Sequence, residues 1–298
     1  MLSKKRFKKF NIRSPGQKAG TFIFMAQKVS IQGFEGSFHQ IAAQQFFGKE
    51  VGILPCATFR EVVDSTKAKQ TDASVMAIEN SIAGSILPNY NLLHKSNLSI
   101  VGEVYLPIKQ HLLVNPGVKL EDIQEVHSHP MAIQQCLDYL VQCPWKLVET
   151  EDTALSAKHI HQRKNKHAAA IAGKLAADLF QLEIAAENIH TAKNNYTRFL
   201  ILQREKKEVN SADKASISFH TDHSRGSLAN VLTRIADGGI NLSKLQSFPI
   251  PGTNWKYNFH ADMEFESIDQ FDSVMKAITP VTEQTKIYGV YKNGNHKK

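Results

Sequence analysis

The feature that most constrains the fold of this chain is a regular alternation of strand-like and helix-like segments from residue 28 onward. Strands joined by segments of helical length form α/β layers through crossover connections. Ligands of such layers bind where the strands end. The predicted order is strand 29–32, helix 37–47, strand 52–55, helix 59–69 and strand 73–78, then strands 100–107 and 111–114 leading into a second lobe.

The second lobe is predicted to repeat this pattern. A helix over 131–143 has Ile133 and Leu137 on its apolar face. Gln135 lies about two hundred degrees around the helix from Ile133, so it points toward solvent or a cleft. Strand 146–149, helix 153–163, strand 168–172 and helix 174–180 follow, and the chain returns in a buried strand that begins with Thr197-Arg198-Phe199.

A charged segment poor in apolar residues, 204–214, predicts a linker to a separate C-terminal domain. Beyond it, four strands alternate with two helices in a ferredoxin-like β-α-β-β-α-β order. The expected elements are strand 215–219, helix 227–237, strands 242–248 and 255–263, helix 268–278 and strand 287–291. A fold of this kind does not by itself determine a function.

The positive charge of the chain is concentrated in its first 24 residues. Seven of the 36 Lys and Arg residues lie there without an acidic residue, which leaves 29 against 28 Asp and Glu in the rest of the chain. This arm lacks the interleaved aromatic residues and the periodic apolar face of a nucleic-acid or membrane binder. We therefore predict a disordered tail over 1–27 and no nucleic-acid or membrane partner. A chain that starts at Met25 should fold like the full chain and have the same activity.

The cysteines and histidines argue against a disulfide framework and against a zinc site. Cys56, Cys136 and Cys143 form no paired motif, which favours a reducing, cytoplasmic compartment. His127 and His129 have no third ligand at a recognised spacing. No apolar run approaches the length of a membrane span.

Polar residues gather where several predicted strands end or begin. A glycine turn at 33–36 is followed by a possible helix cap at Ser37, and Glu79-Asn80-Ser81 ends another strand. Asn194-Asn195 stands just before the strand that contains Thr197. Side chains at the mouth of a buried strand are held rigidly while they face a ligand. Each block alone also fits an ordinary turn or cap.

Taken together, these blocks resemble a known enzyme family in their order and spacing. Gly36-Ser37-Phe38, Glu79-Asn80-Ser81, Ser128-His129-Pro130 with Gln135-Cys136, and Thr197-Arg198-Phe199 resemble the signature blocks of prephenate dehydratase. Residues 215–291 resemble the ACT regulatory domain that commonly follows it, through Gly226-Ser227-Leu228 and Gly239-Ile240-Asn241-Leu242. The resemblance implies a dehydratase domain over 28–205, with two lobes similar to those of periplasmic binding proteins, and an ACT domain over 214–292.

The resemblance implies a carbon–oxygen lyase of phenylalanine biosynthesis that converts prephenate into phenylpyruvate, with loss of water and carbon dioxide and with no metal or organic cofactor. Because the ring becomes aromatic, such an enzyme mainly needs to position its substrate and hydrogen-bond the departing oxygen. In the implied site Thr197 assists the departing hydroxyl and Glu79 orients the site. The substrate is positioned by Asn80, Ser128, Gln135 and Arg198, with further contacts from Gly36, Ser37, His39, Ser81 and Phe199.

The resemblance to the ACT domain implies a phenylalanine site between the subunits of a homodimer or homotetramer. Its residues would be Gly226, Ser227, Leu228, Asn241, Leu242, Gln246 and Ser247. Relatives carry Glu-Ser-Arg-Pro where this chain has Gln246-Ser247-Phe248-Pro249, so both charges are missing. We expect phenylalanine to bind, because the backbone N–H groups at the Gly226 turn suit a carboxylate. The alternative is a domain retained only as a subunit interface.

Two other functions stay open at this level. Arogenate differs from prephenate by a side-chain amino group, and the sequence does not distinguish an arogenate dehydratase from a prephenate dehydratase. The chain could also be a non-catalytic amino-acid sensor, in which the lobes bind a small acid without converting it. Turnover of prephenate or arogenate separates these possibilities.

Overall fold

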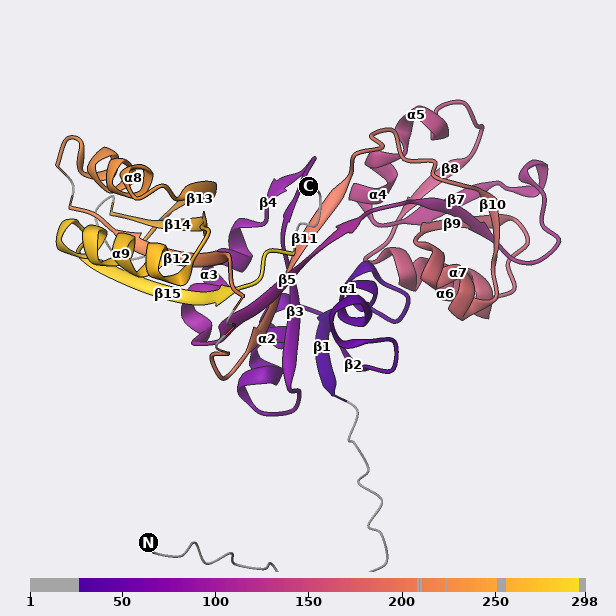
Figure 1. Ribbon diagram of the computed structural model, residues 1–298. Helices are drawn as coiled ribbons and strands as arrows, with labels where there is room; N and C mark the ends of the chain where they lie inside the picture. Colours follow the sequence, from indigo (N-terminus) through magenta and orange to yellow (C-terminus); the bar gives the residue numbers. More distant parts are fainter. Residues whose placement is uncertain (1–26, 208, 210, 223, 251–255, 295–298) are drawn as a thin grey trace, which may run out of the picture.

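The computed structural model describes residues 27–207, 209, 211–222, 224–250 and 256–294. The described chain forms three sheets, each with helices packed on it (Figure 1). The first lobe lies at the centre of the view, the second lobe at the right, and the C-terminal domain at the left. The predicted tail lies outside the described residues. No helix in the described part is long and apolar enough to cross a membrane.

The first lobe is a mixed sheet with the strand order β2-β1-β3-β11-β5, and β4 pairs with the end of β3. The first three strands are parallel, whereas β11 runs antiparallel to both β3 and β5. Its strands are β1 (Lys28–Gln32), β2 (Gly52–Cys56), β3 (Ala73–Asn80), β4 (Gly84–Ser85), β5 (Ser99–Pro107) and β11 (Tyr196–Gln203). Its helices are α1 (Phe38–Phe47), α2 (Phe59–Lys67) and α3 (Leu87–Ser96).

The second lobe is a five-stranded sheet with the order β10-β6-β9-β7-β8. It contains β6 (His111–Val114), β7 (Glu125–Ser128), β8 (Lys146–Glu149), β9 (Ala168–Ala172) and β10 (Glu183–Ala186), together with α4 (Pro130–Gln135), α5 (Leu137–Leu140), α6 (Thr153–Gln162), α7 (Lys174–Phe180) and the short helix η1 (Leu120–Asp122). All five residues of β9 are buried, and four of them are alanines, so the helices approach this strand closely.

The predicted helix over 131–143 is wrong in one respect, because the structure divides it into α4 and α5 at Cys136. Cys136 has φ −112° and ψ 10°, outside the helical range. Its side chain is fully buried in the core of the second lobe with Ile133 and Leu140. The break therefore turns the last residue of α4, Gln135, toward the space between the lobes.

The C-terminal domain has the predicted β-α-β-β-α-β order, with strands arranged β13-β14-β12-β15 and every pair antiparallel. Its elements are β12 (Lys214–His220), α8 (Ser227–Asp237), β13 (Asn241–Pro249), β14 (Tyr257–Glu264), α9 (Ile268–Ile278), η2 (Thr279–Val281) and β15 (Gln284–Tyr291). The first two residues of the predicted strand 255–263 differ from this assignment: residue 255 lies outside the described residues, and β14 starts at Tyr257.

The C-terminal domain packs directly against the first lobe through β15 and β5. A Cβ atom on Gly289 would lie 2.0 Å from the carbonyl oxygen of Ile100, so only glycine permits this approach. The predicted linker 204–214 is not free at either end. Arg204 donates to the carbonyl oxygens of Thr66 and Thr71, and Lys214 is buried as the first residue of β12.

Candidate functional site

A cavity of about 360 Å³ lies between the two lobes. The first lobe contributes side chains from the ends of β1, β3 and β11 and from the start of α1. The second lobe contributes side chains from the residues just before β6, from both ends of α4 and from the start of α6. The lining residues are Gln32, Ser37, Phe38, His39, Phe59, Ala77, Asn80, Ala83, Ile86, Ile108, Gln110, His129, Met131, Ala132, Gln135, Glu151, Asp152, Thr153, Thr197 and Phe199. Six of the predicted site residues are therefore in this cleft: Ser37, His39, Asn80, Gln135, Thr197 and Phe199.

Thr197 is held in the cleft by the pairing of β11 with β3. It lies opposite Asn80 in the antiparallel register, and its side chain is 9% exposed. The Asn80 amide nitrogen donates to Thr197 Oγ1 over 3.0 Å. Asn80 Oδ1 accepts from the backbone N–H groups of Ile82 and Ala83 at 3.0 and 2.9 Å, which fixes the direction of this amide. Because Oγ1 already accepts a hydrogen bond, the hydroxyl hydrogen of Thr197 is available to donate to a ligand.

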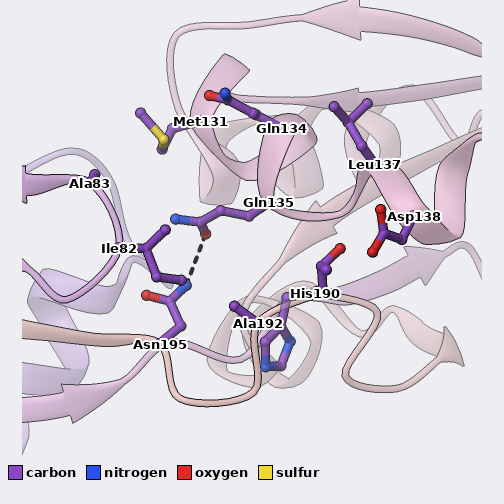
Figure 2. A pocket seen from close by; sticks show the side chains of 11 residues that line it. Ile82, Ala83, Met131, Gln134, Gln135, Leu137, Asp138, His190, Ala192 and Asn195 are labelled. Carbon is purple, nitrogen blue, oxygen red and sulfur yellow. Dashed lines mark hydrogen bonds between the residues drawn. The ribbon is translucent and has the colours of Figure 1, made fainter.

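Gln135 reaches the cleft from the second lobe and is bonded to Asn195. Asn195 Nδ2 donates to Gln135 Oε1 over 3.0 Å, and this bond joins the two lobes in Figure 2. Asn195 was not predicted as a site residue. The sequence did offer a signal for it, since Asn195 is an amide residue two positions before Thr197, where a buried strand begins. A second cavity of about 590 Å³ adjoins the cleft and shares Ala83, Met131 and Gln135 with it.

His39 presents a neutral imidazole to the cleft. Its ring lies against Phe59 and Phe199, with ring centroids 5.5 and 4.9 Å away. Burial lowers the pKa of His39 to about 3. Its Nε2 atom is buried and has no hydrogen-bond partner among the described residues. Gln110 Oε1 is likewise buried without a partner, and Gln110 was also missed by the sequence analysis. Ligand groups in the cleft could satisfy both atoms.

Gly36 and Ser37 position the first turn of α1 at the edge of the cleft. Ser37 caps the helix by accepting from the backbone N–H of Gln40 at 3.4 Å. The Gln40 side chain accepts in return from the backbone N–H of Gly36 at 2.7 Å. Gly36 has φ +87°, and a Cβ there would lie 3.0 Å from the Cα of Ala176. Gly36 is thus needed for the turn, although it does not line the cavity.

The electrostatic character of the cleft is unusual for a site expected to bind a dicarboxylate. No lysine or arginine occurs among the described residues that line it. Its carboxyl groups are those of Glu151 and Asp152. Asp152 caps α6 by accepting from the backbone N–H of Leu155 at 2.9 Å, and burial raises its pKa. Because Asp152 occupies the start of α6, backbone N–H groups at the start of α1 and side-chain amides are the main donors available in the cleft.

Arg198 requires a correction, because the structure places it outside the cleft. Side chains alternate along a strand, so Thr197 and Phe199 face the cleft while Arg198 faces the C-terminal domain. Its Nε donates to Glu103 at 2.6 Å, and its other nitrogens donate to Asp262 and to the Tyr291 hydroxyl. Its side chain is 4% exposed. The prediction that Arg198 contacts the substrate is wrong for this arrangement.

Three further predicted residues also lie outside the cavity lining. Glu79 accepts from Lys244 of the C-terminal domain. Ser128 is fully buried, and its hydroxyl donates to the Ile171 carbonyl at 2.7 Å, which ties β7 to β9. Ser81 Oγ donates to the Asn194 carbonyl at 3.1 Å and accepts from the Tyr196 N–H at 2.9 Å. These residues support the strands that carry the cleft residues rather than line the cleft.

The residues predicted to bind phenylalanine lie on two parts of the C-terminal domain. Gly226 has φ +82° and starts α8, where Leu228 packs against the domain core. The Ser227 hydroxyl donates to the Asp222 carbonyl at 2.9 Å. Asn241, Leu242, Gln246 and Ser247 lie on β13, whose only neighbour among the described strands is β14.

Phe248, which replaces an arginine of the implied motif, is 5% exposed. It packs in a cluster that joins the first lobe to the C-terminal domain, with Leu93 of α3 and Tyr288 of β15. The missing arginine is therefore replaced by an apolar contact between domains. The Phe248 side chain is turned away from solvent, whereas an arginine that bound an exposed ligand would have to face solvent.

Comparisons with known proteins agree with this architecture. The family profile "PDT: Prephenate dehydratase" matches residues 29–207. The chain is 36% identical over 258 residues to "Arogenate dehydratase/prephenate dehydratase 1, chloroplastic" of Arabidopsis thaliana, which covers 81% of this chain and 66% of that protein. It is also similar to the structure of prephenate dehydratase from Arthrobacter aurescens in complex with L-Phe, with 26% identity, a TM-score of 0.81 and 90% of each chain covered.

A further solved structure has the same architecture, but its name gives a different activity. The protein described as "GqqA- a novel type of quorum quenching acylases" is 28% identical to this chain, with a TM-score of 0.83, and the match covers 91% of this chain and all of that one. The same architecture can carry different chemistry, so the residues of the cleft have to support the function.

Proposed function

The chain belongs to the prephenate dehydratase family, and we propose that its cleft converts prephenate into phenylpyruvate with release of water and carbon dioxide. The observation that carries this proposal is the hydrogen bond from the Asn80 amide to Thr197 Oγ1. That bond leaves the threonine hydrogen free to donate inside a cleft between two lobes. A positioned donor of this kind is what an elimination with a departing hydroxyl requires.

The proposed reaction needs little beyond positioning. The bond between the ring and its carboxylate breaks, and its electron pair enters the ring. The ring becomes aromatic as the C–O bond on the opposite side breaks, and the hydroxide leaves with one proton as water. Thr197 donates a hydrogen bond to the departing oxygen. Because a threonine hydroxyl is a weak acid, the proton that ends on water must come from solvent through the hydrogen-bonded site.

The lining of the cleft suits the other parts of the substrate. Phe59, Phe199 and the neutral ring of His39 offer flat apolar surfaces for a six-membered ring. Since the described lining contains no lysine or arginine, and the Asp152 carboxyl already caps the start of α6, the two substrate carboxylates would bind to side-chain amide N–H groups and to the start of α1. Gln135 Nε2 is one such donor, because its carbonyl oxygen is already bonded to Asn195.

The test is turnover by the purified protein. Prephenate and arogenate are supplied separately, and formation of phenylpyruvate from the first and of phenylalanine from the second is followed. Faster turnover of prephenate supports the proposal. Preference for arogenate is the alternative raised by the dual name of the Arabidopsis relative. Binding without turnover of either compound would instead favour the amino-acid sensor.

We further propose that the C-terminal domain is an ACT domain through which phenylalanine inhibits the enzyme. Its β-α-β-β-α-β order, the Gly226 turn before α8 and the L-Phe bound to the Arthrobacter aurescens protein support this idea. The open edge of β13, with Leu245 39% exposed, supports pairing of this domain in a homodimer or homotetramer. The free Cys56, Cys136 and Cys143 are consistent with a cytoplasmic enzyme.

Calorimetric titration with phenylalanine beside inhibition kinetics tests the regulatory proposal. Gly226→Val should abolish binding, because a β-branched residue strains the φ of +82° at the turn. The matched control is Gly117→Val, which has a similar φ of +79° but lies in the second lobe. Heat of binding with inhibition supports an allosteric site. No heat and no inhibition at millimolar phenylalanine would leave the domain as a subunit interface.

A further inference from the structure

The side chains of Asn80, Asn195 and Gln135 form a hydrogen-bonded series, here called the amide network. Its direction is set at one end by the backbone. The N–H groups of Ile82 and Ala83 both donate to Asn80 Oδ1, over 3.0 and 2.9 Å. Because that oxygen receives two donors, the Asn80 side chain must turn its NH2 group toward β11.

Asn195 transmits this direction across the cleft. The Asn80 nitrogen lies 2.7 Å from Asn195 Oδ1, 3.1 Å from the Tyr196 carbonyl and 3.0 Å from Thr197 Oγ1. Since its oxygen accepts from Asn80, Asn195 directs its own nitrogen to Gln135 Oε1 at 3.0 Å. The Gln135 nitrogen then points away from Asn195, toward the side of Ala83 and Met131 (Figure 2).

The position of Asn195 leaves its side chain little freedom. Asn195 is 1% exposed, and its carbonyl accepts from the Ile108 N–H at 2.8 Å. It contacts Asn80 from the first lobe and Gln135 from the second lobe. A side chain that served only to fill this space would not need both amide atoms engaged. Leaving either amide atom buried and unpaired would be destabilising.

We propose that Asn195 is a positioning residue that determines which end of the Gln135 amide faces the substrate. Through Asn195, the backbone of 82–83 sets Gln135 Nε2 as a donor toward the cleft, whereas the Thr197 hydroxyl is set by Asn80 directly. The proposal rests on the proposed function, because the departing hydroxyl and the carboxylates of the substrate require donors rather than acceptors. Asn195 touches Gln135 and Asn80, and it acts on the substrate through them.

Asn195→Asp tests this role with almost no change in shape. A carboxylate at 195 accepts from Asn80 and also from Gln135, so Gln135 must turn its oxygen toward the cleft. An acceptor then faces the substrate carboxylates. We expect KM for prephenate to rise and kcat/KM to fall on the order of a hundredfold. The matched control is Asn194→Asp, which adds the same charge on an exposed side chain and should leave both constants within about twofold.

A double-mutant cycle separates positioning from packing. If Asn195 acts through Gln135, Asn195→Asp should cost little in a Gln135→Ala background, although it costs much in the wild type. A merely structural role would give additive losses in kcat/KM and would overturn the proposal, as would near wild-type kinetics of Asn195→Asp. If the aspartate variant does not fold by circular dichroism, the same cycle is run with Asn195→Ser.

The wild-type assay distinguishes this proposal from the proposed function. If the wild type converts neither prephenate nor arogenate, the dehydratase function fails, and the positioning role built on it fails as well. If the wild type is active and the cycle is additive, only the positioning role of Asn195 fails. The expected result is an active wild type and a strongly non-additive cycle.

Discussion

The cleft and the interface between the first lobe and the C-terminal domain are built on opposite faces of one strand, β11. On the cleft face, Thr197 is surrounded by neutral amides and aromatic rings. On the other face, Arg198 belongs to a buried charge network, defined here as Glu103, Arg198, Lys214 and Asp262. The side chains in the charge network are at most 4% exposed.

The difference follows from what each face has to do. The cleft must receive a charged substrate, and neutral donors with a fixed direction bind anions without a resident counter-ion to displace. At the interface the charged side chains are buried between two domains, so they must balance one another. Burial opposes the charge of Asp262, but the Arg198 guanidinium outweighs this and holds the pKa of Asp262 well below its usual range. Asp262 and Glu103 in turn raise the pKa of Arg198 despite its burial.

Under the proposed function, adjacent residues serve activity and domain association separately. A change at Thr197 should reduce turnover without unfolding the protein, whereas a change at Arg198 should unfold it or separate the domains. Four experiments break or sharpen this contrast: three compare the two faces of β11, and the last compares the centre of the interface with its rim.

The largest effect is expected at the interface. Arg198→Met leaves Glu103 and Asp262 buried with less positive charge, so the free energy of unfolding should fall by about 3–5 kcal/mol. Urea denaturation followed by circular dichroism measures it. Arg225→Met removes an exposed arginine and should change the value by less than about 0.5 kcal/mol. A loss below about 1 kcal/mol at Arg198 would mean that the charge network contributes little net stability.

The corresponding change on the cleft face should act on catalysis. Thr197→Val is nearly isosteric and keeps a β-branched residue in the strand, but it removes the donor to the departing oxygen. We expect kcat to fall on the order of a hundredfold or more while the melting temperature stays close to that of the wild type. Thr197→Ser, which keeps the hydroxyl, should recover most of the lost rate. A kcat near wild type for the valine variant would remove Thr197 from the mechanism.

The two faces should also lose stability in different pH ranges. The pKa of His39 is lowered to about 3 in the folded state, from an unperturbed value of about 6.5. As pH falls below about 6.5, the unfolded state therefore binds the proton first, and stability declines until pH approaches 3. Asp262 also has a lowered pKa, so its contribution is present above the ordinary pKa of a carboxyl group, about 4, and is lost only below it.

His39→Gln checks this pH dependence. It should flatten the pH dependence of the free energy of unfolding between about pH 6 and pH 4 relative to the wild type, by up to about 1.4 kcal/mol per pH unit, as measured by urea denaturation at each pH. Among the described residues, four other histidines have a pKa lowered by burial, and they are the same in both proteins: His94, His111, His190 and His220. The difference between the two curves therefore reports His39. Parallel curves would show that its imidazole is not held neutral.

The smallest effect is expected at the rim of the interface. Lys244 pairs with Glu79, and their side chains are 16% and 30% exposed. Lys244→Met should therefore lower the free energy of unfolding by only about 0.2–1 kcal/mol, and less at high salt. Comparison with Arg198→Met, each measured at low and high salt, shows how far burial controls the strength of these pairs. An equally large loss at Lys244 would contradict this dependence on burial.

Several features could be predicted from the sequence because they depend on local patterns. The alternation of apolar runs predicted most strands of the two lobes, although not β4, β7 or β10, and the β-α-β-β-α-β order of the C-terminal domain. Helices α8 and α9 have the predicted bounds, since their apolar residues recur at the helical period. Thr197, Asn80 and Gln135 were singled out by their positions at strand ends and on a polar helix face, and all three line the cleft.

Only the tertiary structure decided which face of each strand meets the cleft and which meets another domain. Arg198 and Glu79 are polar neighbours of cleft residues, and nothing in a strand that is buried on both faces marks which side is which. The role proposed for Asn195 likewise depends on two residues, Asn80 and Gln135, that are far from it in the sequence. Hydrogen-bond direction is a property of the whole network, because each amide takes the orientation that its partners leave open.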